Sequence, residues 1–155
     1  MLRVSKLADY GTVVMASMAR DPLRVHSAAE VAMRIGLGTP TVSKVLKTLA
    51  RSGLVSSSRG VNGGYRLPRA PGEITIAQII DAMDGPIGMT ECSGVHSLCP
   101  QEGACSVRAS WRTINHLVLE TLSRVTLEQM AQSATHAVPL ATLERRPSRT
   151  TTTTP

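Results

Sequence analysis

Four segments of the first 85 residues place apolar side chains at the three- and four-residue intervals of an amphipathic helix. In chain order, the apolar positions are Leu7, Tyr10, Val14 and Met18; Val31 and Ile35; Val42, Val45, Leu46 and Leu49; and Ile76, Ile79, Ile80 and Met83. Each segment is followed by residues that end helices, namely Asp21–Pro22, Gly36, Gly53 and Gly85–Pro86. The pattern therefore predicts a mainly helical domain over residues 1–85.

Capping signals precede the second and third of these helices. Ser27 and Glu30 form a capping box, in which the Ser27 hydroxyl accepts from the backbone of Glu30 while the Glu30 side chain reaches back. Thr39 is an N-cap that places Pro40 at the first helical position. Two short helices joined through residues 36–38 are typical of a helix-turn-helix. The second of them leaves polar side chains on its outer surface: Thr41, Ser43, Lys44, Lys47, Thr48 and Arg51.

A β-hairpin is expected directly after the second helix of this pair. Residues 54–58 and 65–67 are the predicted strands, and the connector 59–64 supplies glycines for positive backbone angles. Such a hairpin is a wing, so the predicted fold class is mainly α with a small β-hairpin wing, a winged helix-turn-helix. Arg59 lies at the turn, where a guanidinium could reach a minor groove or a phosphate. A plain hairpin on a small core is the alternative.

The charge distribution favours a polyanionic partner. The chain carries a net charge of +6, but no acidic residue occurs between Glu30 and Glu73, where seven basic residues lie: Arg34, Lys44, Lys47, Arg51, Arg59, Arg66 and Arg69. A basic block confined to one folded segment is typical of nucleic-acid binding, although a solvated basic face has the same composition. Aromatic residues make up only 2% of the chain, which argues against base stacking on single strands or RNA. Double-stranded DNA is the expected partner.

Three cysteines lie in or beside a loop without helical or strand periodicity, residues 88–104. Six residues separate Cys92 from Cys99, and five separate Cys99 from Cys105. Thiolates are soft ligands for iron–sulfur clusters, copper(I) or zinc, and these spacings are wider than those of most structural zinc sites. The candidates for a fourth ligand are His96, Glu91, Glu102 and, across a dimer, Asp9. Three unliganded thiols are the alternative for the whole loop.

A long helix is predicted from about Ser106 to Met130. Its apolar stripe consists of Val107, Trp111, Ile114, Val118 and Val125, widened by Leu117, Leu122 and Leu127. Because the small domain is already complete, a second copy of the chain is expected to bury this stripe. The predicted organisation is a winged helix-turn-helix domain over 1–85, a cysteine-rich cluster-binding loop over 86–105, a dimerisation helix over 106–131 and a disordered tail over 132–155.

Other classes of protein find little support in the sequence. No apolar stretch is long enough to cross a bilayer, and the first residues lack the layout of a signal peptide, so a cytoplasmic location is expected. No nucleophile–base set, phosphate loop or pair of carboxylates on one element indicates catalysis. We therefore expect neither an enzyme nor a small-molecule substrate.

Four stretches of the sequence resemble the IscR-type family of iron–sulfur transcription regulators: residues 2–11, 41–49 and 53–67, and the three-cysteine loop before Trp111. The resemblance covers about residues 1–131 and is strongest, at residues 9–15, 25–30 and 90–92, to the proteobacterial regulators of the SUF assembly operon. It implies a homodimer that binds operator DNA, and a 2Fe-2S or 4Fe-4S cluster on Cys92, Cys99 and Cys105. The implied DNA contacts are Thr41, Ser43, Lys44 and Arg59, and the basic helix surface adds Lys47.

One position departs from the family pattern. The cluster-biogenesis branch carries a histidine ligand three residues after its last cysteine, where this chain has Arg108. A guanidinium stays protonated and is a poor iron ligand. The nitric-oxide-sensing branch takes an aspartate from the first helix of the partner subunit, and Asp9 lies at the matching position. The hypothesis is that Asp9 completes the site across the dimer.

The function predicted from the sequence is a repressor or dual regulator of iron–sulfur assembly genes that senses an iron–sulfur cluster. A nitric-oxide or redox sensor of the same fold is the first alternative. The second is a zinc-stabilised module that binds DNA or an acidic protein. An enzyme with Cys105 as nucleophile has no identifiable base in the sequence.

Overall fold

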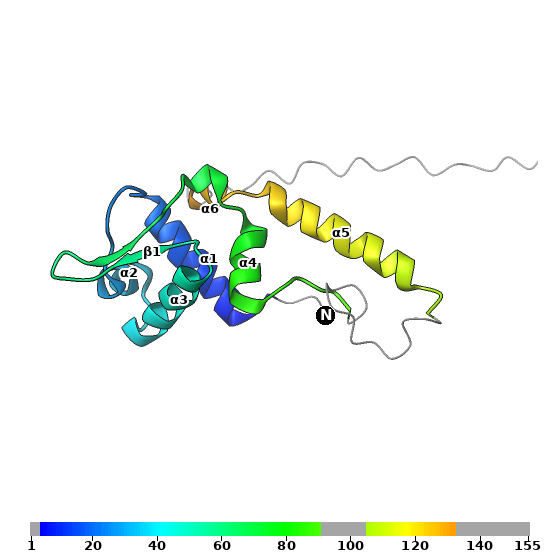
Figure 1. The fold of residues 1–155 in the computed structure, drawn as a ribbon, viewed down its shortest axis with the longest axis horizontal. Coiled ribbons are helices and arrows are strands. Elements are labelled where there is room, and N and C mark those ends of the chain that lie inside the picture. Colours follow the sequence, from blue (N-terminus) through cyan, green and yellow to red (C-terminus); the bar gives the residue numbers. More distant parts are fainter. Residues whose placement is uncertain (1–3, 91–104, 133–155) are drawn as a thin grey trace, which may run out of the picture.

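The computed structural model describes residues 4–90 and 105–132. Its elements, in chain order, are α1 (Lys6–Ala19), α2 (Ala28–Ile35), α3 (Thr39–Arg51), β1 (Ser56–Ser58), β2 (Gly64–Arg66), the short 3-10 helix η1 (Pro71–Glu73), α4 (Ile76–Asp84), α5 (Arg108–Arg124) and α6 (Leu127–Gln132). The hairpin extends from the end of the domain where α2 and α3 lie, while α5 extends toward the opposite end (Figure 1). This arrangement confirms the predicted fold class. None of the helices in these two ranges has the length and apolar content to cross a membrane.

The core of the domain is built around α1, which contacts α2, α3, α4 and α6. The apolar positions predicted for the third helix are all fully buried: Val42, Val45, Leu46 and Leu49. Val14, Met18 and Ile79 are fully buried too, so the helical periodicity of the sequence identified the core-facing sides correctly. Because the chain has no phenylalanine, aliphatic and methionine side chains fill this space.

The helix starts agree with the capping signals only in part. The Ser27 hydroxyl accepts from the backbone N–H of Glu30 at 3.1 Å, as predicted. The Glu30 carboxylate does not return to Ser27 but contacts two arginines, which are stronger partners for a charged group. The expected N-cap at Thr39 is wrong by one residue, since Gly38 is the N-cap of α3 and Thr39 is already helical. Pro40 is tolerated inside the first turn because N–H groups there have no partner within the helix.

The wing is a two-stranded antiparallel hairpin, in which Ser57 lies opposite Tyr65. Its strands are shorter than predicted, because Leu54, Val55 and Leu67 are buried in the helical core instead. Gly60 adopts the positive φ that the sequence predicted, at 109°. Gly63 has a different role, since a Cβ there would lie 2.4 Å from the Ser58 carbonyl oxygen. This glycine allows the two sides of the turn to approach each other.

The single helix predicted over about residues 106–130 is two helices in the structure. α5 ends at Arg124, and α6 begins at Leu127 after a bridge between Thr126 and Thr75, the N-cap of α4. Thr126 caps α6, because its hydroxyl accepts from Gln129 N at 3.2 Å and the Gln129 side chain accepts from Thr126 N at 2.9 Å. Leu127, expected on the apolar stripe of the long helix, is instead fully buried in the domain core.

The cap of α6 gives a test of this break. Replacing Thr126 by alanine removes the hydroxyl that accepts from Gln129 N, and we expect the free energy of unfolding to fall by about 1 kcal/mol. Thr121→Ala is the matched control, because the Thr121 hydroxyl bonds only within α5, to the Leu117 carbonyl, and its side chain is exposed. Chemical denaturation of the two variants measures the difference. Equal stability of both variants would contradict the cap at Thr126.

Candidate nucleic-acid interface and cysteine site

The helix-turn-helix predicted from the sequence is formed by α2 and α3. Gly36 ends α2 with a left-handed backbone, at φ 69°, which turns the chain toward α3. The buried side of α3 contacts the core, and Lys44 and Lys47 project from its exposed side. Thr41 and Ser43 are half-buried on the same helix. Side chains of this kind on the second helix of the motif are suited to contact base edges and phosphates.

Exposed basic side chains continue from α3 into the wing, and we call them the basic set: Lys44, Lys47, Arg51, Arg59 and Arg66. Arg59 directly follows β1, at the turn of the hairpin. Within residues 4–90 and 105–132, no ion pair neutralises any member of this set; the arginine ion pairs found there involve Arg24, Arg34 and Arg124. Five cationic side chains with no acidic partner in the described part of the chain form a region of positive potential that attracts a polyanion.

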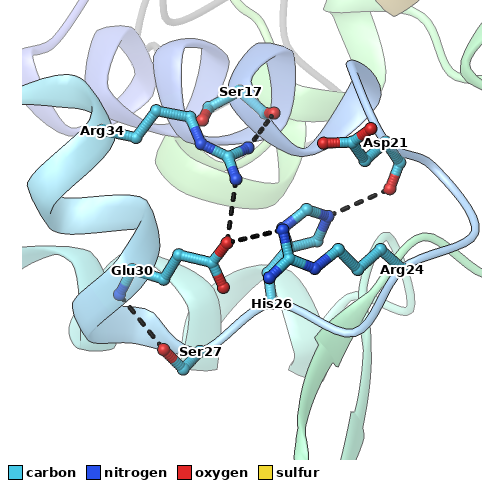
Figure 2. A network of polar contacts seen from close by, with 7 residues as sticks. All are labelled: Ser17, Asp21, Arg24, His26, Ser27, Glu30 and Arg34. Carbon is cyan, nitrogen blue, oxygen red and sulfur yellow. Dashed lines mark hydrogen bonds and ion pairs between the residues drawn. The ribbon is translucent and has the colours of Figure 1, made fainter.

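A polar network fixes α2 against α1 and the loop between them (Figure 2). Glu30 on α2 is its centre, since one carboxylate oxygen lies 2.9 Å from both the Arg24 and the Arg34 guanidinium. Arg34 also donates to the Ser17 carbonyl of α1 at 3.1 Å. These ion pairs are partly exposed and each contributes at most about 1 kcal/mol. These pairs chiefly fix geometry, because they hold the first helix of the helix-turn-helix in one orientation on α1.

His26 connects the same loop to the wing. Its backbone forms two hydrogen bonds with Tyr65 of β2, N to O and O to N, each of 2.8 Å. Its ring is 1% exposed, and Nε2 lies 3.0 Å from the Asp21 carbonyl oxygen (Figure 2). Because a carbonyl only accepts, Nε2 carries the hydrogen in this contact. His26 thus extends the hairpin by a third short segment and attaches its base to the body of the domain.

The sequence analysis did not predict the contacts that attach α2 and the wing to the body of the domain. The ion pair of Glu30 with Arg34 could have been predicted, because oppositely charged residues four apart on a helix commonly pair. The bridge of His26 with Tyr65 had no such signal, since it joins backbone atoms 39 residues apart whatever the side chains are.

Only part of the predicted cysteine site lies in the described ranges. Cys92 and Cys99 lie outside them, as do the candidate ligands Glu91, His96 and Glu102. The tail predicted to be disordered over 132–155 also lies outside them except for its first residue, Gln132, which is the last residue of α6. Cys105 is half-buried and free, and it precedes α5. Among the described residues, no three metal-binding side chains gather within one chain.

The donor set suits a soft metal or a cluster. The Cys105 carbonyl accepts from the backbone N–H of Arg108, the first residue of α5, at 3.4 Å. This places Cys105 just before the N-terminal end of α5. Asp9 lies in the first turn of α1 with an exposed side chain, so its carboxylate is accessible to a second molecule. The described residues thus offer one thiol and one accessible carboxylate, which are the types of donor that a group held by thiolates and one oxygen ligand requires.

The apolar side of α5 is largely uncovered in the single chain. Val107, Ile114 and Leu117 are 52%, 40% and 55% exposed, and Trp111 is only half-buried. Apolar side chains in this arrangement on one helix are typical of a protein–protein contact.

Comparison with known proteins points to one family of regulators. Residues 4–133 match the Rrf2 family, described as iron-dependent transcriptional regulators. The HTH-type transcriptional regulator IscR of Xenorhabdus nematophila is 31% identical over 105 residues, which are 68% of this chain and 63% of that protein. Protein aau3 of Rhizobium meliloti is 28% identical over 133 residues, 85% of this chain and 86% of that protein. This chain thus spans somewhat less than two thirds of the IscR relative.

Solved structures show the same architecture. The structure of CymR (YrzC), the global cysteine regulator of B. subtilis, matches with a TM-score of 0.68 and 33% identity, covering 85% of this chain and 98% of that one. T. potens IscR matches with a TM-score of 0.65 and 28% identity, covering 86% and 88%.

The attachment of the wing gives a test of its role. A Cβ at Gly64 would lie 2.6 Å from the His26 carbonyl oxygen, so we expect Gly64→Ala to separate the two segments and to cost about 1–3 kcal/mol of stability. Hydrogen exchange at the Tyr65 amide, which donates to that oxygen, should become faster. Gly72→Ala is the control, because its Cβ would meet only the flexible end of the Glu128 side chain. Unchanged exchange at Tyr65 in Gly64→Ala would contradict the attachment.

Proposed function

The chain belongs to the Rrf2 family of transcriptional regulators, and we propose that it is a homodimeric repressor of iron–sulfur assembly genes that senses an iron–sulfur cluster. The observation that carries its DNA-binding role is the basic set on α3 and the wing, which has no acidic partner among the described residues. The IscR and CymR relatives are named as regulators, which agrees with a DNA-binding protein and not with an enzyme.

DNA recognition follows from the geometry of the motif. α3 enters the major groove, where Thr41 and Ser43 face base edges and Lys44 and Lys47 contact bases or phosphates. Arg59 reaches the adjacent minor groove or its phosphates from the wing. The wing is a suitable carrier for this arginine because His26 joins its base to the domain.

The cluster is proposed to be held by Cys92, Cys99 and Cys105, with Asp9 of the partner subunit as the fourth ligand. The half-buried Cys105 at the start of α5 and the exposed Asp9 support this assignment. When bound, a cluster with three thiolates and one weaker oxygen ligand supplies a labile group that responds to oxidants, nitric oxide or iron supply. The chain contributes the ligands and a loop that begins and ends beside α5.

The second copy is proposed to lie on α5. The apolar side chains of this region, including Val107, Ile114 and Leu117, are exposed in the single chain. An antiparallel or crossing α5 helix from a second copy would bury them. Dimerisation also provides the paired recognition helices that such regulators use on two half-sites. Iron–sulfur assembly genes, those of the SUF system first, are the proposed targets because of the resemblance at residues 9–15, 25–30 and 90–92.

A second candidate is regulation by cysteine supply. The similarity to the B. subtilis global cysteine regulator, at 33% identity over nearly the whole of that chain, favours it. Measuring the iron and acid-labile sulfide content of the protein distinguishes the two candidates, because only iron–sulfur sensing requires a bound cluster.

The wing arginine gives the test of DNA binding. We expect Arg59→Ala to lower operator affinity by about tenfold and to reduce the dependence of log affinity on log salt by about one, since one phosphate contact is lost. Arg112→Ala, an exposed arginine on α5 outside the basic set, is the matched control and should bind as the wild type does. Titration of fluorescent operator DNA at several salt concentrations measures both quantities. Wild-type affinity in Arg59→Ala would show that the wing does not contact DNA.

The cluster gives a second test. Protein purified anaerobically should be brown and contain both iron and acid-labile sulfide, and Cys105→Ala should contain neither. Asp9→Ala should release iron to a chelator about tenfold faster than the wild type while gel filtration still shows a dimer. Thr12→Ala on the same helix is the control. A colourless wild-type protein after anaerobic reconstitution would contradict cluster sensing and favour the second candidate.

A further inference from the structure

One polar side chain is buried on the otherwise accessible helix α5. Asn115 is 5% exposed, and it is the buried residue of Arg108–Arg124, whose apolar side chains are all more accessible. A buried polar group is costly unless its hydrogen bonds are satisfied, so the contacts of this carboxamide indicate why it is there.

The carboxamide of Asn115 pairs with the backbone on both sides of Gly88. Its Oδ1 accepts from the Met89 N–H at 3.1 Å, and its Nδ2 donates to the Ile87 carbonyl at 3.4 Å. A carboxamide has one donor and one acceptor side, as a peptide group does, so it pairs with this segment as a neighbouring strand would. Aspartate lacks the donor, and leucine of similar size lacks both groups.

This contact lies at the start of the cysteine loop. Met89 lies three residues before Cys92, and the loop returns to the same helix through Cys105. Asn115 lies on α5 two turns after the residue with which α5 begins, Arg108. Both ends of the loop are therefore attached to α5, one through Asn115 and one through the chain itself. Restricting the ends of a loop reduces the entropy that ligand binding by the loop must overcome.

We propose that Asn115 is a positioning residue, which holds the entry of the cysteine loop on α5 and so couples the state of the loop to the helix that carries the dimer contact. The inference rests on the proposed function, since it assumes that the loop holds a cluster. Loss of the two hydrogen bonds of Asn115 removes none of the proposed ligands but detaches Ile87 and Met89 from α5.

Asn115→Leu is the variant that tests the proposal, with Thr113→Ala as the matched control. The Thr113 side chain is exposed on the same helix and its hydroxyl bonds only to the Ala109 carbonyl. Anaerobically purified Asn115→Leu should release iron to a chelator about tenfold faster than the wild type. Its operator affinity should differ less between the cluster-loaded and cluster-free forms, with the ratio reduced at least about fivefold. Gel filtration should still show a dimer.

Cluster-free wild-type protein provides a readout that needs no variant. The Met89 amide should exchange with solvent as slowly as the amides in the middle of α5, because it donates to a buried oxygen. If Asn115→Leu does not fold, Asn115→Asp replaces it, since aspartate keeps the acceptor for Met89 and loses only the donor to Ile87. Its iron release to a chelator should then be faster than that of the wild type, but by less than the tenfold increase expected for Asn115→Leu.

The outcomes separate this inference from the proposed function. A wild-type protein without iron and sulfide overturns both. A wild-type protein whose operator affinity depends on the cluster, together with an Asn115→Leu variant that behaves identically, overturns the role of Asn115 alone. Fast exchange at Met89 in the wild type does the same. The proposed role of Asn115 is supported if the variant releases iron faster, remains a dimer, and shows a smaller ratio of operator affinities between its cluster-loaded and cluster-free forms.

Discussion

The bridge between Thr75 and Thr126 determines how α5 and α6 are attached to the winged domain. Ile76 N donates to the Val125 carbonyl at 2.9 Å, and Leu127 N donates to the Ile74 carbonyl at 2.8 Å. These two bonds draw the chain across the core and place Leu127 inside it, fully buried. Because α5 ends at this bridge, its direction away from the domain is set by the core. α6 then packs on α1 and on η1, which prevents the bridge from opening.

A helix anchored at one end leaves the rest of its length with few contacts. α4 packs against α5, while the Ile114 and Leu117 side chains remain 40% and 55% exposed. A second copy that covers these residues therefore meets a helix whose orientation is already fixed relative to the DNA-binding motif. For the proposed dimer, this means that the spacing of the two α3 helices is determined by the bridge and by the crossing of the α5 helices.

The sequence was sufficient to predict the elements whose apolar residues follow one period and whose ends carry strong signals. α1 to α4 and the hairpin belong to this group. The break between α5 and α6 was missed because the apolar pattern continues through Leu122, Val125 and Leu127 without interruption. A capping box at Thr126 and Gln129 was present, but its effect depends on a bridge to Thr75, 51 residues earlier. Long-range backbone pairing of this kind leaves no periodic pattern.

The candidate site likewise contains residues that could be predicted from the sequence and contacts that could not. The basic set could be predicted because charge is a property of the sequence itself, and exposure on α3 follows from the helical period. The contacts that orient these residues could not, since His26 and Asn115 act through backbone atoms of Tyr65, Ile87 and Met89. Any residue except proline offers a backbone N–H and a carbonyl, so the identities of Tyr65 and Met89 do not indicate that these contacts form.

Two connections join α5 to α3, and both pass through tightly packed side chains. The bridge leads from α5 into α4, and α6 leads from α5 to α1; both α1 and α4 contact α3. The residues along these connections, such as Met15, Leu46 and Ile79, are fully buried, and close-packed interiors transmit a displacement as a rigid movement. The wing follows, since His26 ties it to the loop after α1. In the proposed dimer, a signal at the cysteine loop would therefore act on the crossing of the two α5 helices, which changes the relation of the two DNA-binding motifs and not the internal shape of either one.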